Sequence, residues 1–148
     1  MQLTRFTDYA LRVLMFVGRH RDRDRVCTMR EIAVHHRISL EHLRKVIHKL
    51  AKSGYLNTTR GRGGGIVLGR DVAEIRLGEV ILAMEEDMSI VDCQALECIL
   101  QPACSLKTAL DRGGRAFIAE LNEVTLADLL GDKQMKRQFR IVDGVGRR

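Results

Sequence analysis

The stretch TMREIAVHHRISLEHLRKVIHKLAKSG, residues 28–54, predicts two short helices joined by a tight turn. Thr28 and Glu31 have the spacing of a Ser/Thr-x-x-Glu capping box, which would start the first helix. Ser39 is a good N-cap for the second helix, and Gly54 stands where a C-cap glycine belongs. One face of that helix is apolar, with Leu40, Leu43, Ile47 and Leu50 at helical spacing. This pattern is typical of a helix-turn-helix.

A candidate β-hairpin follows this pair of helices directly. YLNTTR (55–60) and IVLG (66–69) are predicted strands, and the glycine-rich GRGGG (61–65) is the turn between them. An earlier helix is indicated by the spacing of Phe6, Ala10, Val13, Leu14 and Val17. A helix, a helix-turn-helix and a hairpin in this order predict a winged helix-turn-helix DNA-binding domain over residues 1–75.

Residues 76–130 have a different character. LGEVILAMEE (77–86) is predicted to be helical, and a cysteine-rich segment follows it. The residues Leu106, Leu110, Gly113, Phe117 and Leu121 then step by four, three, four and four. This predicts a long amphipathic helix with a narrow apolar seam, suited to dimerisation. The pattern leaves open the alternative that the seam packs on its own domain.

The rest of the chain completes a mainly α fold with a small β-hairpin. TLADLL (125–130) is predicted to form a short helix with Thr125 as N-cap. Residues 131–148 are expected to be a basic, flexible tail. No apolar run approaches the ~20 residues of a membrane span, and residues 1–18 lack the features of a signal peptide. A cytoplasmic protein without a membrane partner is therefore expected.

The net charge of +6 is unevenly distributed along the chain. Residues 1–70 contain 15 Lys/Arg against 5 Asp/Glu, whereas residues 71–130 contain 4 against 12. A basic first half is the footprint of a surface that binds a polyanion such as double-stranded DNA. The charge alone does not exclude a solvated basic face with no partner.

The predicted reading surface lies on the second helix of the helix-turn-helix and on the hairpin tip. Glu41, His42 and Lys45 are candidates for base contacts, because the N-terminal residues of a recognition helix face base edges. Arg60 and Arg62 suit insertion into a narrow minor groove. The remaining candidate DNA contacts are Thr28, Ser39, Arg44, His48, Lys49 and Lys52. Thr28 and Ser39 also have a simpler role as helix caps.

Three cysteines, Cys93, Cys98 and Cys104, lie within twelve residues. In a reducing compartment such a cluster indicates metal or redox chemistry rather than structural disulfides. The spacing is compatible with a disulfide switch, a zinc site or an iron–sulfur cluster, and it favours the cluster modestly, because zinc sites more often contain C-x2-C pairs. Cys27 lies outside this segment and is expected to be a packed or free thiol.

The sequence resembles the winged-helix iron–sulfur regulators of the Rrf2 family. The shared features span nearly the whole chain: MQLTRFTDYALRVL (1–14), RGRGGGIVLG (60–69), IRLGEVI (75–81), the three cysteines and TLADLL (125–130). The resemblance implies a homodimer in which Cys93, Cys98 and Cys104 hold one [2Fe-2S] or [4Fe-4S] cluster per subunit. It further implies a repressor that binds a palindromic operator.

The fourth ligand separates two kinds of family member. Cluster-assembly regulators of the family have a histidine three residues after the last cysteine, and this chain has Lys107 there. Asp8 matches the acidic residue proposed as the fourth ligand, from the partner subunit, in nitric-oxide-sensing members. The resemblance thus favours a nitric oxide sensor. Asp8 could alternatively be a first-turn charge that complements the helix dipole.

Other functions remain as alternatives. One is a regulator of the same family that senses iron, redox state or cluster status. Another is an iron–sulfur electron-transfer or assembly protein, which would have no use for a basic recognition helix. The sequence does not predict an enzyme, because it shows no Ser/His/Asp or paired-carboxylate constellation.

Overall fold

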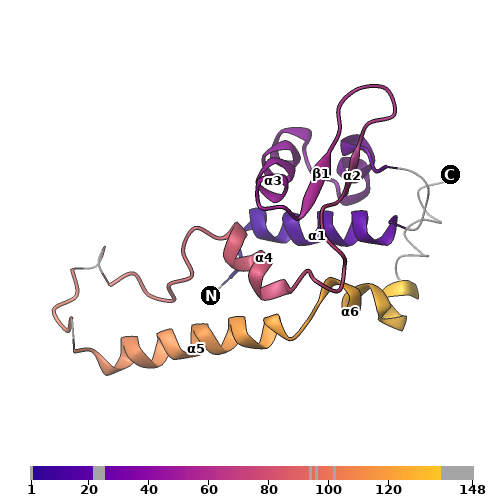
Figure 1. Ribbon diagram of the computed structural model, residues 1–148. Helices are drawn as coiled ribbons and strands as arrows, with labels where there is room; N and C mark the ends of the chain where they lie inside the picture. The colour runs from indigo at the N-terminus through magenta and orange to yellow at the C-terminus, as the bar shows by residue number, and fades with distance from the viewer. Residues whose placement is uncertain (1, 22–25, 94, 96, 102, 138–148) are drawn as a thin grey trace.

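The computed structural model describes residues 2–21, 26–93, 95, 97–101 and 103–137 of the chain. Their helices and strands are α1 (Arg5–Arg19), α2 (Met29–His36), α3 (Leu40–Lys52), β1 (Leu56–Thr58), β2 (Ile66–Leu68), α4 (Leu77–Met84), α5 (Ser105–Asn122) and α6 (Leu126–Gly131). The predicted fold class is confirmed: the chain is mainly helical with a two-stranded hairpin (Figure 1). No helix in this part of the chain is long and apolar enough to cross a bilayer.

The helix-turn-helix forms from the local signals that predict it. The Thr28 hydroxyl accepts a hydrogen bond from the Glu31 N–H, and the Glu31 carboxylate accepts one from the Thr28 N–H, which completes the capping box of α2. Ser39 caps α3 by accepting from the His42 N–H at 3.3 Å. Gly54 ends α3 with a φ of 76°, a left-handed conformation that costs glycine little.

The apolar face of α3 differs by one residue from the predicted one. Leu43, Ile47 and Leu50 are buried as expected, and Val46 joins them. The prediction for Leu40 is wrong, because its side chain is 48% exposed. Leu40 is the first residue of α3 and lies at the end of the helix, beyond the part that packs on the core.

The hairpin β1–β2 is antiparallel, with Leu56 opposite Leu68 and Thr58 opposite Ile66. An isolated bridge between Cys27 and Ile66 adds a short third segment to this sheet, which the sequence pattern did not indicate. Cys27 is 2% exposed, so its expected role as a packed thiol is confirmed. The bridge attaches the start of the helix-turn-helix to the base of the wing.

Helix α1 lies at the centre of the fold and packs on α2, α3, α4, α6 and β2. It runs through Gly18 to Arg19. A β-carbon on Gly18 would lie 2.9 Å from Leu130 Cδ1, so the glycine lets α6 approach closely. Leu126 and Leu130 of α6 are buried in the same core as α1. The C-terminal helix therefore supports the DNA-binding half.

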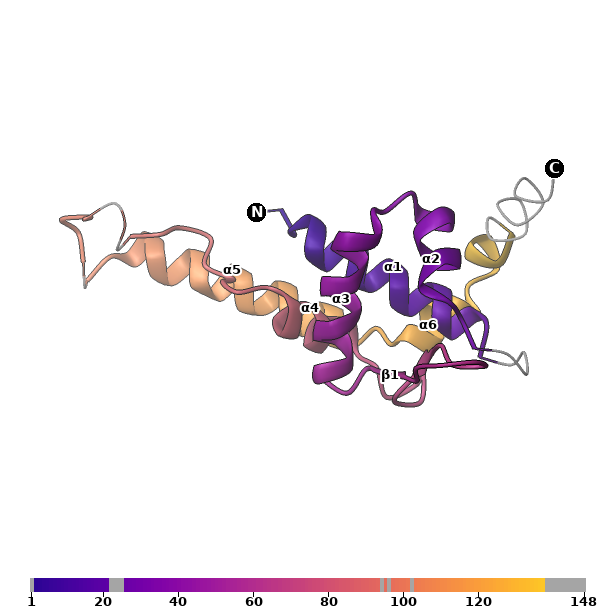
Figure 2. The ribbon, with the colours of Figure 1, turned by 90° about the horizontal axis from the view of Figure 1, so that it is seen from above.

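Helix α5 extends away from this core and carries the thiol loop, residues 86–104, at its far end (Figures 1 and 2). It packs on α4 near its C-terminus, where Gly78 faces Asn122. None of its residues is buried within the described chain, and Leu106 of the predicted seam is 64% exposed. The chain by itself covers the seam only in part, since Leu110, Phe117 and Leu121 are half-buried.

The predicted tail, residues 131–148, is described only in part. Asp132 accepts a hydrogen bond from the Met135 N–H at 2.7 Å, and residues 133–137 form a helical turn. The expectation of a flexible end for residues 138–148 lies outside the described residues.

Candidate nucleic-acid interface and thiol loop

One face of α3 is free to meet a duplex. The side chains of Glu41, His42, Arg44, Lys45 and His48 are all exposed. The structure thus brings together five of the predicted DNA-reading residues on the side of α3 opposite its buried Leu43, Val46, Ile47 and Leu50.

Glu41 and Lys45 form an exposed ion pair one turn apart on this face, with an N–O distance of 3.5 Å. Exposed pairs of this kind contribute about 0–1 kcal/mol to stability. Breaking the pair therefore costs little, and both side chains remain available to a base edge or a phosphate.

The wing presents Arg60 and Arg62 at its exposed tip, which stands clear of the helices (Figure 1). Gly61 and Gly63 alternate with these arginines and have φ values of 95° and 81°, a left-handed conformation that favours glycine. The backbone can therefore turn sharply while both guanidinium groups point into solvent.

Thr28 and Ser39 are confirmed as helix caps. The Thr28 hydroxyl also donates to Glu31 Oε2 at 2.9 Å, so both of its hydrogen-bonding roles are used within the capping box. A phosphate contact by Thr28 would have to displace one of these bonds.

Lys49 does not lie with the exposed basic side chains. Its Nζ donates a hydrogen bond to the carbonyl oxygen of Met84 at 2.8 Å. The same ammonium lies 5.4 Å from the centre of the Phe6 ring. The predicted phosphate contact of Lys49 therefore competes with an interaction inside the chain.

The three clustered cysteines are free thiols on one partly exposed loop. The Cys98 N–H donates to the Cys93 carbonyl at 3.2 Å, which folds the loop back on itself. Cys104 is the N-cap residue of α5, and its side chain makes no capping hydrogen bond. In the described residues, no three His, Cys, Asp or Glu side chains lie close enough together to hold a metal ion. The three thiols are therefore partly exposed, but they are too far apart in this conformation to bind one metal ion together.

Lys107 forms an ion pair with Asp111, with 2.6 Å between Nζ and Oδ2. The hydrogen bond to Asp111 raises the pKa of Lys107, and the charges of Asp111 and the nearby Cys93 raise it further. The ammonium therefore stays protonated at neutral pH. It cannot serve as a metal ligand, in agreement with the sequence-based reasoning.

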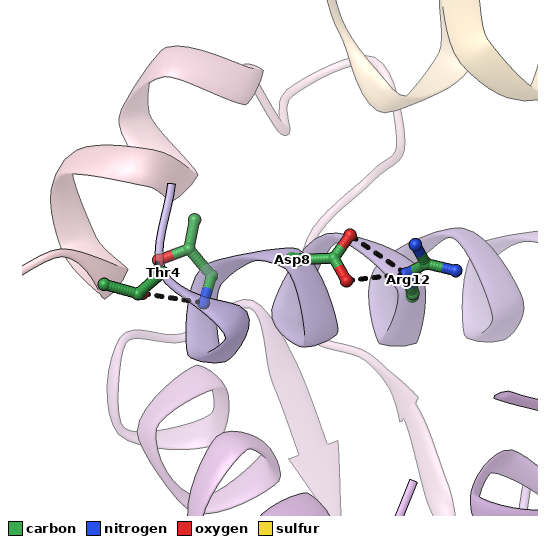
Figure 3. Close-up of polar contacts among 4 residues, drawn as sticks. Thr4, Asp8 and Arg12 are labelled. Atoms are coloured by element: carbon green, nitrogen blue, oxygen red, sulfur yellow. Dashed lines mark hydrogen bonds and ion pairs between the residues drawn. The ribbon is translucent and has the colours of Figure 1, made fainter. Parts of the chain in front are cut away.

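Asp8 lies on the exposed side of α1, and both of its carboxylate oxygens accept from Arg12 Nε at 2.9 Å (Figure 3). Its side chain is 46% exposed, so a group from outside the chain can reach it. It borders a hollow of about 570 Å³ that is also lined by Leu11, Met15 and Leu129. Asp8 is the acidic residue of the first turn of α1, the position that its alternative role as a helix-dipole charge requires.

His36 of α2 faces the same region of α1. The pKa of His36 is lowered to about 4, first by burial and then by the charges of His35 and Arg12, while Asp8 acts in the opposite direction. The rings of His35 and His36 are in contact, with 4.6 Å between their centres. The His36 ring also lies 5.8 Å from the Phe16 ring of α1, a contact between α1 and α2 to which sequence reasoning assigned no role.

Comparison with known proteins gives the chain a family. The profile of the Rrf2 family, described as iron-dependent transcriptional regulators, matches residues 3–132. The HTH-type transcriptional regulator NsrR of Geobacillus kaustophilus is 45% identical over 142 residues, which are 94% of this chain and 96% of that protein. The regulator of the same name from Bacillus subtilis is 42% identical over 137 residues, 90% of this chain and 93% of that protein.

Solved structures agree on the fold. CymR, the global cysteine regulator of B. subtilis, has a TM-score of 0.72 at 23% identity, covering 88% of this chain and 97% of CymR. IscR of T. potens has a TM-score of 0.69 at 22% identity, covering 89% and 88% of the two chains. On the family profile and the two regulators that it resembles over nearly its full length, the chain belongs to the Rrf2 family of transcriptional regulators.

Proposed function

We propose that the chain is an iron–sulfur-dependent transcriptional repressor that binds its operator as a homodimer and releases it in response to nitric oxide. The observation that carries this proposal is the placement of three free thiols on one loop that leaves the DNA-reading half directly after α4. The likeness to NsrR over nearly the whole chain supports the same function.

The exposed face of α3 and the wing arginines support DNA binding. In a dimer, two copies of α3 would enter successive major grooves about 34 Å apart on a palindromic site. Most of the affinity would come from phosphate contacts by basic side chains, which makes it dependent on salt.

The partly covered seam of α5 supports the homodimer. An 18-residue helix with no buried residue leaves apolar side chains such as Leu106 in water. A second copy of the same helix would remove them from solvent, with a gain of about 25 cal/mol per Å² of apolar surface. The dimer would hold the two α3 helices at a defined separation.

The chemistry of the loop fits an iron–sulfur cluster. Three thiols are the soft donors that such clusters require. Cys93, Cys98 and Cys104 would hold one [2Fe-2S] or [4Fe-4S] cluster per subunit, and the loop would have to gather them. When bound, the cluster supplies iron that reacts with nitric oxide.

Asp8 is the proposed fourth ligand, reaching the thiol loop from the partner subunit. Its half-exposed carboxylate can be approached from outside the chain. Arg12 gives Asp8 an alternative partner within its own helix when the carboxylate is not engaged across the dimer. A carboxylate is a harder donor than a thiolate, so Asp8 would be the more weakly held ligand of soft iron.

A sensor of iron or cluster status is the second candidate function. It is favoured by the family's description as iron-dependent. Cluster-assembly regulators have a histidine at the position of Lys107. A protonated lysine there argues against an assembly role for this chain.

An anaerobic nitric oxide titration tests the proposal. The absorption spectrum and the operator affinity would be measured on the same sample, with iron and sulfide content determined first. We expect nitric oxide to bleach the cluster and weaken operator binding. Protein that contains no iron or sulfide yet binds its promoter equally tightly would contradict the proposal. A response to iron supply without one to nitric oxide would favour the second candidate.

A further inference from the structure

The recognition helix is connected to the start of the thiol loop by one side chain. Lys49 Nζ of α3 donates to the carbonyl oxygen of Met84, the last residue of α4, at 2.8 Å. The last carbonyls of a helix have no helical N–H partner, and a cation near them also complements the helix dipole. Lys49 therefore caps the C-terminus of α4 from a different helix.

The next residue, Glu85, is held by the N-terminus of α1. Its Oε1 accepts hydrogen bonds from the Thr4 N–H at 2.8 Å and from the Thr4 hydroxyl at 3.1 Å. Thr4 is also the N-cap of α1, so the same residue starts that helix and secures Glu85. The two-residue segment 84–85 is thus attached to both α3 and α1.

This junction lies where the chain leaves the DNA-reading half. The thiol loop begins at Glu86, one residue beyond the segment held by Lys49 and Thr4. Helix α3 otherwise packs mainly on α1, α2 and β1, and α4 on α1 and α5. The Lys49–Met84 hydrogen bond is therefore a direct polar link from α3 to the base of the loop.

From this arrangement we infer that Lys49 is a positioning residue that transmits the state of the thiol loop to the recognition helix of the same chain. While the loop keeps residues 84–85 in place, Lys49 holds the C-terminal half of α3 in its reading orientation. A change in the path of the loop displaces Glu85 and weakens the hydrogen bond between Lys49 and the Met84 carbonyl. The inference rests on the proposed function, because it requires two states of the loop.

The test compares Lys49→Met with Lys49→Arg and Lys52→Met in the full-length, cluster-loaded protein. Lys49→Met keeps an unbranched side chain but removes the donor, whereas Lys49→Arg retains one. Lys52 is on the same helix and is expected to contact a phosphate. Operator affinity is measured before and after nitric oxide treatment over a series of salt concentrations.

In the wild type and in Lys49→Arg, we expect the affinity ratio between the two states to be roughly 5–150-fold, the usual range for coupled sites. In Lys49→Met the ratio should fall toward one, with the salt dependence unchanged. Lys52→Met should instead weaken both states equally and lower the salt slope by about one.

Four results would overturn the inference. The first is a wild-type affinity ratio in Lys49→Met. The second is a salt slope that falls in Lys49→Met as it does in Lys52→Met, because a lower slope would make Lys49 a phosphate contact. A wild type with equal affinity in both states would instead refute the proposed function, and the inference with it. Amide hydrogen exchange can be measured on the wild type and so does not depend on whether the variants fold. Nitric oxide should speed exchange in residues 46–52. Unchanged exchange in these residues would also overturn the inference.

Discussion

Arg12 Nε lies 2.9 Å from each carboxylate oxygen of Asp8, one helical turn earlier on α1. The pair is half-exposed, so its contribution to stability is about 0–1 kcal/mol. Because the ion pair contributes so little to stability, a structural role for Asp8 can be distinguished from a role as a ligand. Asp8→Asn should change the free energy of unfolding by less than about 1 kcal/mol, but it should alter operator binding by the cluster-loaded dimer.

Urea unfolding and operator titration of Asp8→Asn and Arg12→Gln measure the two effects separately. Arg12→Gln is the matched control, because it breaks the same ion pair and leaves the carboxylate in place. Equal operator affinity and nitric oxide response in Asp8→Asn and the wild type would exclude Asp8 as a ligand.

Replacement of Cys98 by Ala should abolish iron and sulfide binding and specific operator binding, while leaving a folded dimer. The thiol is partly exposed on a loop, so its loss removes a ligand and little packing. Cys27→Ala is the control: its buried thiol lies outside the loop, and its loss should cost stability, on the order of 1 kcal/mol, without loss of iron. Iron analysis, size-exclusion chromatography and urea unfolding check these outcomes. Cys98→Ala that still represses and still responds to nitric oxide would show that the sensor assignment is wrong.

The capping box of α2 predicts a stability effect for Thr28→Ala of about 1 kcal/mol, within the 0.5–2 kcal/mol range of N-cap losses. Thr28→Ser keeps the hydroxyl and should recover most of the loss. Denaturant unfolding gives the stability, and operator affinity over a salt series shows whether Thr28 also contacts a phosphate. A folded, fully stable Thr28→Ala would contradict the role of this residue as a cap.

The wing arginines should affect DNA binding and leave stability unchanged. Arg60→Gln and Arg62→Gln each remove an exposed cation, so each should weaken operator binding and lower the salt slope by about one. Arg70→Gln is the contrasting control. Its guanidinium donates to the Ser53 carbonyl at 2.9 Å and lies over the Tyr55 ring, so the change should reduce stability. If neither wing substitution changes the salt slope, the wing arginines do not contact the phosphates of the operator.

Acidification should destabilise the α1–α2 contact through His36. Burial, together with the charges of His35 and Arg12, lowers its pKa from 6.5 to about 4, so the folded state favours the neutral ring. Between these values the unfolded chain binds the proton more readily, and stability is lost as the pH falls through this range. The pKa of His35 is lowered in the same direction, first by burial and then by the charges of Arg19 and His20.

His36→Gln should flatten the pH dependence of the urea midpoint between about pH 6.5 and about pH 4. His48→Gln is the control, because that ring is on the exposed face of α3. An unchanged pH profile in His36→Gln would show that the buried ring does not carry the effect.

Local signals in the sequence predict the wing and the starts of α2, α3 and α6. Thr28, Ser39 and Thr125 each cap a helix by a bond to a residue three positions along the chain. Such bonds depend on neighbouring residues only, so the spacing of a few letters predicts them. The exposed basic face of α3 and the two arginines of the wing could also be predicted from the spacing of residues along the chain.

The positions of the long-range contacts depend on how the elements pack. The Lys49 ammonium finds a carbonyl 35 residues away, and Thr4 meets Glu85 across 81 residues. The sequence could not separate a lysine that faces a phosphate from one that caps another helix, because both have the same charge and helical position. Likewise, the close approach of α6 at Gly18 depends on how the elements pack, which no local pattern encodes.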